Sequence, residues 1–343
     1  MATYRSIVGL KIKKRSSDPS NPVLGEMWYN TTTGTLKVHG FGSATWTSAT
    51  GSPGSQMTWA GCGTQSAYIK TMGEDGTPAP NPLGNDTHLW NGSSWTSGPN
   101  SPYSARDPGA AGVYTAALMF GGQGGPGALN TSISWDGSSF GSTPNLNHQR
   151  RTVNGTGTST SAITVGGAGP PSGNPEGAMT NSESYNGSSW SNETAIPTAF
   201  RGGGQAGEET AAVVIGGYSP AHTSSFEYDG SSWSSGGTTN TARQTGMTGG
   251  AGTGTAALFY GGGPSVSQAE SYDGTSFAVD STMGTGSGGG RGNQNTQGYT
   301  TTAIFTGNPK TPPSPSPAGG YPYTNTTEEY SAAAAATTTV SVS

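Results

Sequence analysis

The sequence predicts an all-β protein built as a closed ring of repeated four-stranded units. A unit recurs about every 45 residues between residues 57 and 330, and such a period is typical of repeat architectures. A complete unit holds an arginine, an apolar run ending in Gly-Gly, a variable polar stretch and an aromatic–Asp/Asn–Gly–x–Ser–aromatic segment, and the first unit lacks the arginine. Glycine accounts for 59 of 343 residues, but the Trp, Tyr and Phe residues fall in register with the period. Disordered chains are poor in aromatic residues, so we expect an ordered protein.

Each strand of the unit has its own signal. The first follows the arginine, as in GGGQAG (202–207), and the second is the apolar run before Gly-Gly, as in TAAVVIGG (210–217). The third ends at the aromatic residue before Asp/Asn-Gly, and the fourth begins at the aromatic residue after it, as in YDGSSW (228–233). Asp-Gly or Asn-Gly between two strands predicts a hairpin, because both residues tolerate positive φ. One carboxylate per unit does not suffice for a calcium loop. The aspartates assigned to these turns are Asp136, Asp229 and Asp273.

A repeated arginine precedes the first glycine of the Gly-Gly pair by about 15 to 18 residues. We therefore assign these arginines to one equivalent position of the repeat. It could form a ring of cationic ligand contacts, or a repeated fork that donates hydrogen bonds to backbone carbonyls between units. We favour the structural role, because a ligand rarely needs the same residue in nearly every unit. The arginines concerned are Arg106, Arg150, Arg151, Arg201, Arg243 and Arg291.

The order arginine, apolar–Gly-Gly, Tyr-Asp and tryptophan resembles the kelch motif, whose repeats form the four-stranded blades of a β-propeller. The resemblance covers about residues 57–330 and is strongest in the four middle units. It implies a kelch-like β-propeller of about six four-stranded blades with a small N-terminal hairpin segment. The sixth unit lacks the Asp-Gly turn and the second aromatic residue after EEY (328–330).

The ends of a ring must meet, because open edge strands invite aggregation. Residues 25–46 contain a hairpin signal at Thr33–Gly34 and an aromatic-to-Trp46 spacing like the second half of a unit. This stretch completes unit six, makes a seventh blade position, or forms a separate hairpin ahead of the ring. We favour the separate hairpin, because the Pro-bearing stretch before it is typical of a linker. The expected organisation is a basic arm, linker and hairpin over 1–50, a propeller over 51–332 and a low-complexity strand or tail over 333–343.

The pattern P-x-x-G-E-x-W-Y-N-x-T-T-G-x-L-K (22–37) resembles short modules of bacteriophage tail and fibre proteins. Together with the Gly/Ser/Thr-rich repeats, it is similar to virion structural proteins of marine bacteriophages. The resemblance implies a non-enzymatic virion protein, a tail fibre or other exposed component, whose N-terminal segment docks to other virion proteins. Its propeller would contact a host-surface glycan or protein, and the chain would be a homo-oligomer in the particle. The docking residues implied are Arg5, Lys11, Lys13, Lys14, Arg15, Trp28 and Tyr29.

Two other function classes remain open: a cellular kelch-type interaction scaffold, and a carbohydrate-active or copper-oxidase-like enzyme. Some kelch propellers are copper oxidases, which use a cysteine-crosslinked tyrosine and clustered histidines. Here Cys62 is the one cysteine, and His39, His88, His148 and His222 occupy different phases without metal-site spacing. We therefore expect no enzyme, metal or cofactor. The net charge of −5 gives no reason to expect nucleic-acid binding, and no apolar run approaches membrane-spanning length.

The stretch between Gly-Gly and the next aromatic residue varies in length from unit to unit. In a propeller these loops emerge on one side of the ring, and variable loops on one face often form a binding surface. Tolerated drift in exposed loops is the alternative. The longest stretches, 168–182 and 308–327, are our candidate contact surface, and the tyrosines there suit sugar or protein recognition. The residues singled out are Asn174, Glu176, Lys310, Tyr321 and Tyr323.

Overall fold

The computed structural model describes residues 12–23, 26–41, 44–53, 56–75, 83–125, 127–170, 177–217, 222–263, 266–287, 291–292, 302–307, 326–333 and 335–339. These residues form β-strands and connections, without a helix among them. Accordingly, none of the described residues belongs to a helix long and apolar enough to cross a membrane. The chain divides into two compact units. We call them the small unit (Met1–Ala44 with Ala332–Ser343) and the propeller unit (Thr45–Ser331).

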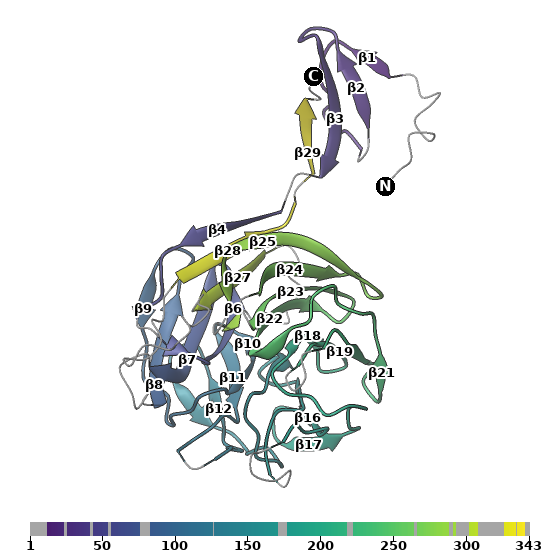
Figure 1. Ribbon diagram of the computed structural model, residues 1–343. Coiled ribbons are helices and arrows are strands. Elements are labelled where there is room, and N and C mark those ends of the chain that lie inside the picture. Colours follow the sequence, from purple (N-terminus) through teal and green to yellow (C-terminus); the bar gives the residue numbers. More distant parts are fainter. Residues whose placement is uncertain are drawn as a thin grey trace, which may run out of the picture. The chain divides into compact units, whose positions relative to one another are not determined.

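The propeller unit is a ring of six antiparallel sheets, or blades (Figure 1). Blade 1 comprises β5 (Gln56–Met57) and β6 (Ala60–Thr64), which share the inner position, then β7 (Ala67–Asp75), β8 (Leu83–Trp90) and β9 (Trp95–Ser97). Blade 2 comprises β10 (Gly109–Val113), β11 (Ala116–Phe120), β12 (Ser132–Trp135) and β13 (Phe140–Ser142). Blade 3 comprises β14 (Gly155–Gly157), β15 (Ala162–Val165), β16 (Ser182–Tyr185) and β17 (Trp190–Glu193). Blade 4 comprises β18 (Gly204–Glu208), β19 (Ala211–Ile215), β20 (Ser225–Tyr228) and β21 (Trp233–Ser235). Blade 5 comprises β22 (Gln244–Thr253), β23 (Ala256–Gly263), β24 (Val266–Tyr272) and β25 (Phe277–Ser287). Blade 6 comprises β26 (Arg291–Gly292), β27 (Thr302–Gly307), β28 (Thr326–Ser331) and β4 (Thr45–Ala49).

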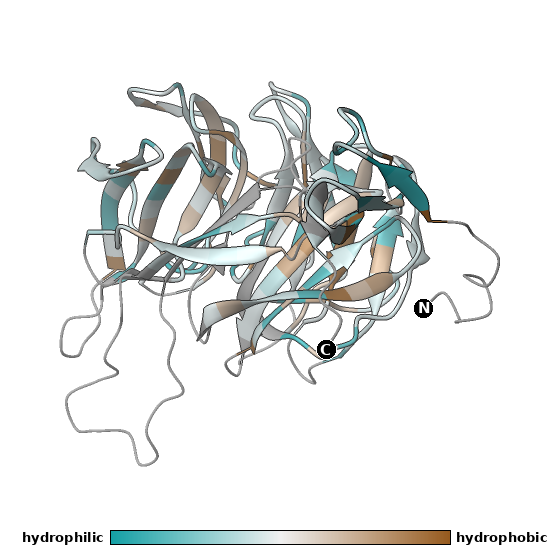
Figure 2. Ribbon diagram, turned by 90° about the horizontal axis from the view of Figure 1, so that it is seen from above, coloured by the Kyte–Doolittle hydropathy of each residue, from teal (hydrophilic) through white to brown (hydrophobic). Residues whose placement is uncertain are grey.

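The predicted fold class is confirmed, with six blades. In blades 2 to 4 the second strand is the apolar run before Gly-Gly, and the third and fourth strands meet at the aromatic–Asp/Asn–Gly turn. Apolar side chains of adjacent blades interleave, as where the ring of Phe120 in blade 2 lies 5.1 Å from that of Trp190 in blade 3. Figure 2 shows the hydrophobic residues concentrated on the strands rather than on the turns. The core of this unit therefore lies between blades.

The ring closes on itself near its axis. Inner strands contact one another in turn from β6 through β10, β14, β18 and β22 to β26, and β26 contacts β6. Backbone hydrogen bonds also link successive blades, from the N–H of Asp107 to the carbonyl of Thr58 (2.8 Å), from Thr152 to Asp107 (3.0 Å) and from Gly202 to Thr152 (3.2 Å). All four residues have φ between 52° and 69°. Such strain persists at three non-glycine positions because neighbouring blades hold the backbone there.

The N-terminal strand β4 closes the sixth blade. It pairs with β28 so that Trp46 lies opposite Tyr330, as Trp190 lies opposite Tyr185 in blade 3. The Trp46 ring lies 5.2 Å from Tyr330 and 5.0 Å from Tyr260 of blade 5. Trp46 therefore supplies the second aromatic residue that the sixth repeat lacks.

The small unit is a sheet in the order β1 (Lys13–Arg15), β2 (Met27–Asn30), β3 (Thr35–Phe41) and β29 (Ala335–Thr339). The hairpin signal at Thr33–Gly34 marks the β2–β3 turn, where Gly34 has a φ of 66°. Residues 25–46 thus serve both roles weighed above, because 27–41 belong to the small unit and 45–46 to the ring. The structure divides the chain after Ala44 rather than after residue 50, and residues 335–339 of the expected C-terminal strand or tail pair with β3.

Removal of the closing aromatic residue should weaken the ring. In Trp46→Ala we expect a loss of about 1–3 kcal/mol in the free energy of unfolding, because two aromatic contacts and their buried area disappear. Urea denaturation followed by tryptophan fluorescence measures this loss. Thr47→Ala, an exposed neighbour on the same strand, serves as the control and should change stability by less than about 0.5 kcal/mol. Equal stability of both variants would show that this strand does not hold the ring closed.

Candidate functional site

In the small unit, Trp28 is a core residue. It is completely buried, and its indole Nε1 donates to the Asp18 carboxylate at 2.9 Å. Asn30 and Lys37 donate to the same carboxylate at 2.8 and 2.7 Å. These hydrogen bonds, that of Lys37 above all, lower the pKa of Asp18 to about 2. Trp28 was predicted to dock to other virion proteins, but in this structure its ring holds the small unit together and offers no surface.

Other predicted docking residues do lie on the surface of the small unit. Lys13 and Lys14 are exposed on β1, and Tyr29 is 37% exposed. Arg15 is partly exposed and donates to Glu26 at 2.9 Å. Arg5 and Lys11 lie outside the described residues.

The two faces of the propeller unit carry different connections. We call the face with the turns between first and second and between third and fourth strands the turn face. The opposite one, where the second strand connects to the third, is the loop face. Antiparallel pairing places these connections at opposite ends of the strands. All five residues predicted for the loop-face contact surface lie outside the described residues: Asn174, Glu176, Lys310, Tyr321 and Tyr323.

The repeated arginines occupy two positions rather than one. Arg106 and Arg151 each exchange two backbone hydrogen bonds, of 2.6 to 3.1 Å, with the residue after Gly-Gly. Arg150 and Arg243 lie one position earlier in the unit, where their carbonyls accept the N–H of the second glycine at 2.9 Å. The spacing concealed this difference because the pairing of β22 with β23 contains a register shift, which lengthens the fifth unit. Arg201 occupies the position of Arg106 and Arg151, because it directly precedes Gly202, the equivalent of Asp107 and Thr152. Arg291 is the first residue of β26.

The side chains at the earlier position connect blades. Arg150 is fully buried and donates to the carbonyls of Gly166 (3.0 Å) and Asn181 (3.1 Å) and to the Glu183 carboxylate (2.5 Å), all in blade 3. Its own backbone is bonded to blade 2. Arg243 repeats this arrangement between blades 4 and 5. These two arginines are interior contacts and offer nothing to a ligand.

The turn aspartates shape the turn face. The Asp136 carboxylate accepts the backbone N–H groups of Ser138 (2.8 Å) and Ser139 (2.7 Å), and Gly137, which follows Asp136, has a φ of 97°. Asp229 and Asp273 make the same contacts in blades 4 and 5. Backbone hydrogen bonds are the largest cause that lowers the pKa of Asp229 and of Asp273 to about 2. The turn face therefore carries fixed negative charges.

On the turn face, a tyrosine of one blade reaches an acidic residue of the blade before it. The Tyr228 hydroxyl donates to Glu193 at 3.4 Å, and the Tyr330 hydroxyl donates to Asp280 at 3.1 Å. Glu193 and Asp280 both lie three residues after the aromatic residue that begins the fourth strand. A carboxylate at this position thus connects its blade to the next one.

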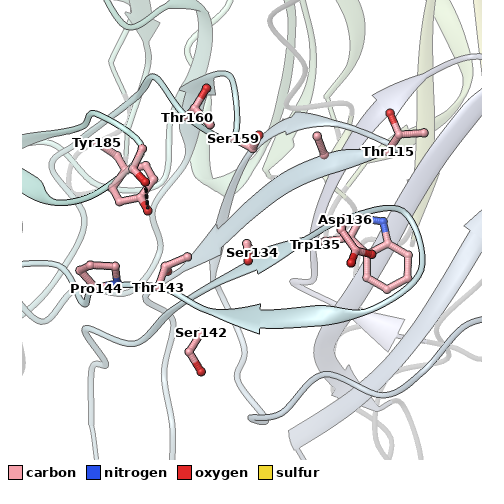
Figure 3. Close-up of a pocket in the computed structure, with 12 residues that line it drawn as sticks. Thr115, Ser134, Trp135, Asp136, Ser142, Thr143, Pro144, Ser159, Thr160 and Tyr185 are labelled. Atoms are coloured by element: carbon pink, nitrogen blue, oxygen red, sulfur yellow. Dashed lines mark hydrogen bonds between the residues drawn. The ribbon is translucent and has the colours of Figure 1, made fainter.

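Between blades 2 and 3 the same position holds Thr143, which is too short to reach across. The Tyr185 hydroxyl turns back to its own turn and donates to the carbonyl of Gly187 at 3.0 Å. A cavity of about 450 Å³ remains between the blades, bounded by Trp135 and Asp136 on one side and by Tyr185 on the other (Figure 3). The serines and threonines that line it are Thr115, Ser134, Ser142, Thr143, Ser159 and Thr160.

A smaller cavity, of about 150 Å³, occupies the equivalent place between blades 4 and 5. The position of Thr143 holds Gly236 here, but Glu227 from the third strand accepts a hydrogen bond from Tyr272 of the next blade. That carboxylate takes up part of the space. We take the larger cavity, hereafter the blade 2/3 groove, as the candidate functional site.

The reactive side chains of blade 1 are closed off. Cys62 is fully buried, and burial raises the pKa of its thiol. Lys70 is 1% exposed, and burial lowers its pKa to about 7. Burial, followed by the charge of Lys70, also lowers the pKa of His88 to about 4. Among the residues that the structure describes, no group of three or more His, Cys, Asp and Glu side chains could hold a metal ion.

Sequence reasoning missed both Lys70 and the blade 2/3 groove. Lys70 lies in an apolar-looking run, YIKTMG, and carries no sequence signal of burial beyond its place in a second strand. The groove did have a signal. Alignment of the units at their second aromatic residue places Thr143 where units three and five carry Glu193 and Asp280.

No family model matches the sequence, and no curated protein matches it. Among solved structures, the chain is similar to YjhT, with a TM-score of 0.62 and 12% sequence identity. The match covers 81% of this chain and 95% of YjhT. Because 228 chains of solved structures match and the identity is low, the likeness shows the β-propeller fold alone.

Proposed function

We propose that this chain is a non-enzymatic structural protein of a bacteriophage particle, a tail fibre or other exposed component. In this proposal the small unit attaches to other virion proteins, and the propeller unit contacts the host surface or neighbouring subunits. The division of the chain carries the proposal, because three strands within residues 13–41 combine with the strand at 335–339 into a separate small sheet. That sheet coincides with the segment that resembles bacteriophage tail modules.

The distribution of charged residues supports different roles for the two units. Residues 1–44 contain six Lys and Arg against two Asp and Glu, whereas residues 45–331 contain eight against seventeen. Among the described residues, three of the four exposed large hydrophobic side chains also belong to the small unit: Ile12 (48% exposed), Val23 (67%) and Tyr29 (37%). A basic surface with exposed apolar residues suits contact with a partner protein. The buried thiol of Cys62 argues against an enzyme that uses this cysteine.

Incorporation into particles tests the proposal. Particles purified from the source should contain the full-length chain, as quantified by mass spectrometry. The variant Lys13→Gln/Lys14→Gln should be incorporated on the order of fivefold less, because it weakens electrostatic complementarity at the attachment surface. Gln149→Glu/Asn192→Asp changes the net charge by the same amount on the exposed surface of the propeller unit and should be incorporated normally. Absence of the chain from particles would contradict the virion role, and equal incorporation of both variants would contradict attachment through β1.

A cellular interaction scaffold is the second candidate, because the β-propeller fold itself suits protein binding. Recovery of the chain from uninfected cells in a stable complex with host proteins, and not from particles, would favour this alternative.

A further inference from the structure

We propose that the blade 2/3 groove is a binding site for an uncharged saccharide. This inference rests on the proposed contact between the propeller unit and a host surface, and it names the site and the ligand class. It places recognition on the turn face.

The hydroxyls of the groove carry the argument. Within the described part of the chain, the side chains of Thr115, Ser134, Ser142 and Ser159 make no hydrogen bond. The buried Oγ1 of Thr143 also lacks a partner there. A hydroxyl both donates and accepts, so a cluster of free hydroxyls matches the alternating donors and acceptors of a sugar ring. The cavity of about 450 Å³ falls within the usual range for small-molecule sites.

The charge of the groove restricts the ligand. Asp136 is the one charged residue among those that line it, and its hydrogen bonds hold the pKa of its carboxyl well below the usual range. Lys, Arg and His are missing from the lining residues. A sialic acid, uronic acid or phosphorylated sugar would therefore meet the negative charge of Asp136 and find no cation among the lining residues. The groove is suited to uncharged sugars, whose hydroxyls can donate to Asp136.

Affinity at one groove should be low. The aromatic rings that border it, Trp135 and Tyr185, are only 1% and 4% exposed, so neither offers a face for sugar stacking. Binding then depends on hydrogen bonds that compete with water, which suggests dissociation constants on the order of 1 mM. Several copies in one particle would raise the avidity for a glycan-covered surface.

Thr143 keeps the groove open. The equivalent residues Glu193 and Asp280 accept hydrogen bonds from the tyrosine of the next blade and so occupy the space between blades. Tyr185 presents its hydroxyl at the corresponding place. In Thr143→Glu the introduced carboxylate should accept a hydrogen bond from the Tyr185 hydroxyl, as Glu193 does from Tyr228 and Asp280 does from Tyr330. It should thereby exclude the sugar.

Saturation-transfer NMR on the full-length chain tests the proposal. The probes are the methyl glycosides of glucose, galactose, mannose, rhamnose and N-acetylglucosamine, with lactose, sialyllactose and a short neutral peptide as comparators. At least one uncharged sugar should receive saturation, and the sialylated sugar should receive less. Thr143→Glu should abolish the signal. Thr115→Val/Ser142→Ala, which removes two groove hydroxyls, should weaken binding about tenfold.

A matched control comes from the repeat itself. Thr210 and Ser235 are the blade 4 equivalents of Thr115 and Ser142, and neither lines the two cavities. Thr210→Val/Ser235→Ala should bind like the parent, and thermal denaturation should show all variants folded. Absence of transfer from every uncharged sugar, equal binding by all variants, or transfer only from sialyllactose or the peptide would overturn the proposal. Particle incorporation of Thr143→Glu should stay normal in every case, so failure here is distinct from failure of the virion role.

Discussion

Replacement of Lys70 by methionine is expected to stabilise the protein near neutral pH and to remove a large part of its pH dependence. The ammonium group of Lys70 is buried in blade 1, where Nζ donates to the Ser52 hydroxyl at 3.0 Å and lies 4.3 Å from the centre of the Trp59 ring. The described residues around it include no carboxylate in contact with it. Burial therefore lowers the pKa of Lys70 from 10.5 to about 7, although the ring face favours the charged form.

The sign follows from proton binding. Between about pH 7 and 10.5 the unfolded chain holds a proton on Lys70 that the folded chain has released, so the free energy of unfolding rises with pH in this window. At about 1.4 kcal/mol per pH unit, the rise amounts to about 5 kcal/mol. The stabilising effect of high pH is complete above 10.5 and is lost as the pH falls to about 7. His88, which pairs with Lys70 across the sheet and has a pKa of about 4, does not titrate in this window.

Urea denaturation of the parent and of Lys70→Met at several pH values measures the effect. Near pH 7 the variant should be about 1–4 kcal/mol more stable, because an apolar residue replaces a buried charge. Its advantage should shrink steadily towards about pH 10. Lys13→Met, in the small unit and exposed, is the control and should leave the pH dependence of the parent unchanged. A stability difference between parent and Lys70→Met that stays constant with pH would contradict the assignment of a neutral, buried lysine.

The second large effect concerns the buried ion pair of blade 3. In Arg150→Met we expect a loss of about 3–5 kcal/mol, because Glu183 would remain buried without its cation. Burial acts against the charged arginine and lowers its pKa, while the glutamate opposes that effect. Glu183 also accepts the backbone N–H groups of Asn147 (2.6 Å) and His148 (3.1 Å), so its own removal leaves further groups unpaired.

Other blades show how this pair can be replaced. At the positions of Arg150 and Glu183, blade 4 carries Phe200 and Phe226, which belong to one buried cluster. The residue equivalent to Asn147 is Pro197 there, and a proline has no N–H that needs an acceptor. The same set of three changes occurs in blade 2, which has Ala105, Ile133 and Pro102. Charged and apolar versions of this contact are therefore interchangeable only as complete sets.

The triple variant Asn147→Pro/Arg150→Phe/Glu183→Phe converts blade 3 to the arrangement of blade 4. We expect it to recover most of the 3–5 kcal/mol that Arg150→Met loses, since apolar replacement of a buried pair is often neutral or stabilising. Denaturation of the single, double and triple variants gives the coupling energies, which should exceed about 1 kcal/mol. Additive losses in the triple variant would refute the view that the three positions act together.

The repeat itself was predictable to the level of single strands. Each strand of blades 2 to 4 begins and ends close to the aromatic, Gly-Gly or Asp/Asn-Gly residue that marked it. Local chemistry suffices here, because alternation, turn residues and apolar runs act over a few neighbouring positions. Prediction was less complete wherever distant segments meet. The hairpin of 27–41 was expected, but the pairing of β29 with β3 was not, because the alanine- and threonine-rich C-terminus has no pattern that selects a partner.

The site residues divide in the same way. Asp136 was assigned to its turn from two neighbouring residues, and it lies there. The two arginine positions could not be separated by spacing, because an irregularity in β22 shifts the count in one unit. Tryptophan is a residue type common at interfaces, and only the complete burial of Trp28 in the structure shows it to be interior. The groove at Thr143 is open because blade 2 lacks, at this position, the carboxylate that blade 3 carries as Glu193 and blade 5 as Asp280.

The sequence by itself determined the ring, since a period of about 45 residues with repeated turn chemistry leaves few other ways to bury each blade. Only the tertiary structure decided how the ring closes, which arginines and which lysine are buried, and where a cavity stays open between blades. Those features depend on contacts between residues far apart in the chain, such as Trp46 with Tyr330 and Thr143 facing Tyr185. The sequence of each repeat specifies its own blade, but the shape of the space between two blades depends on side chains from both repeats.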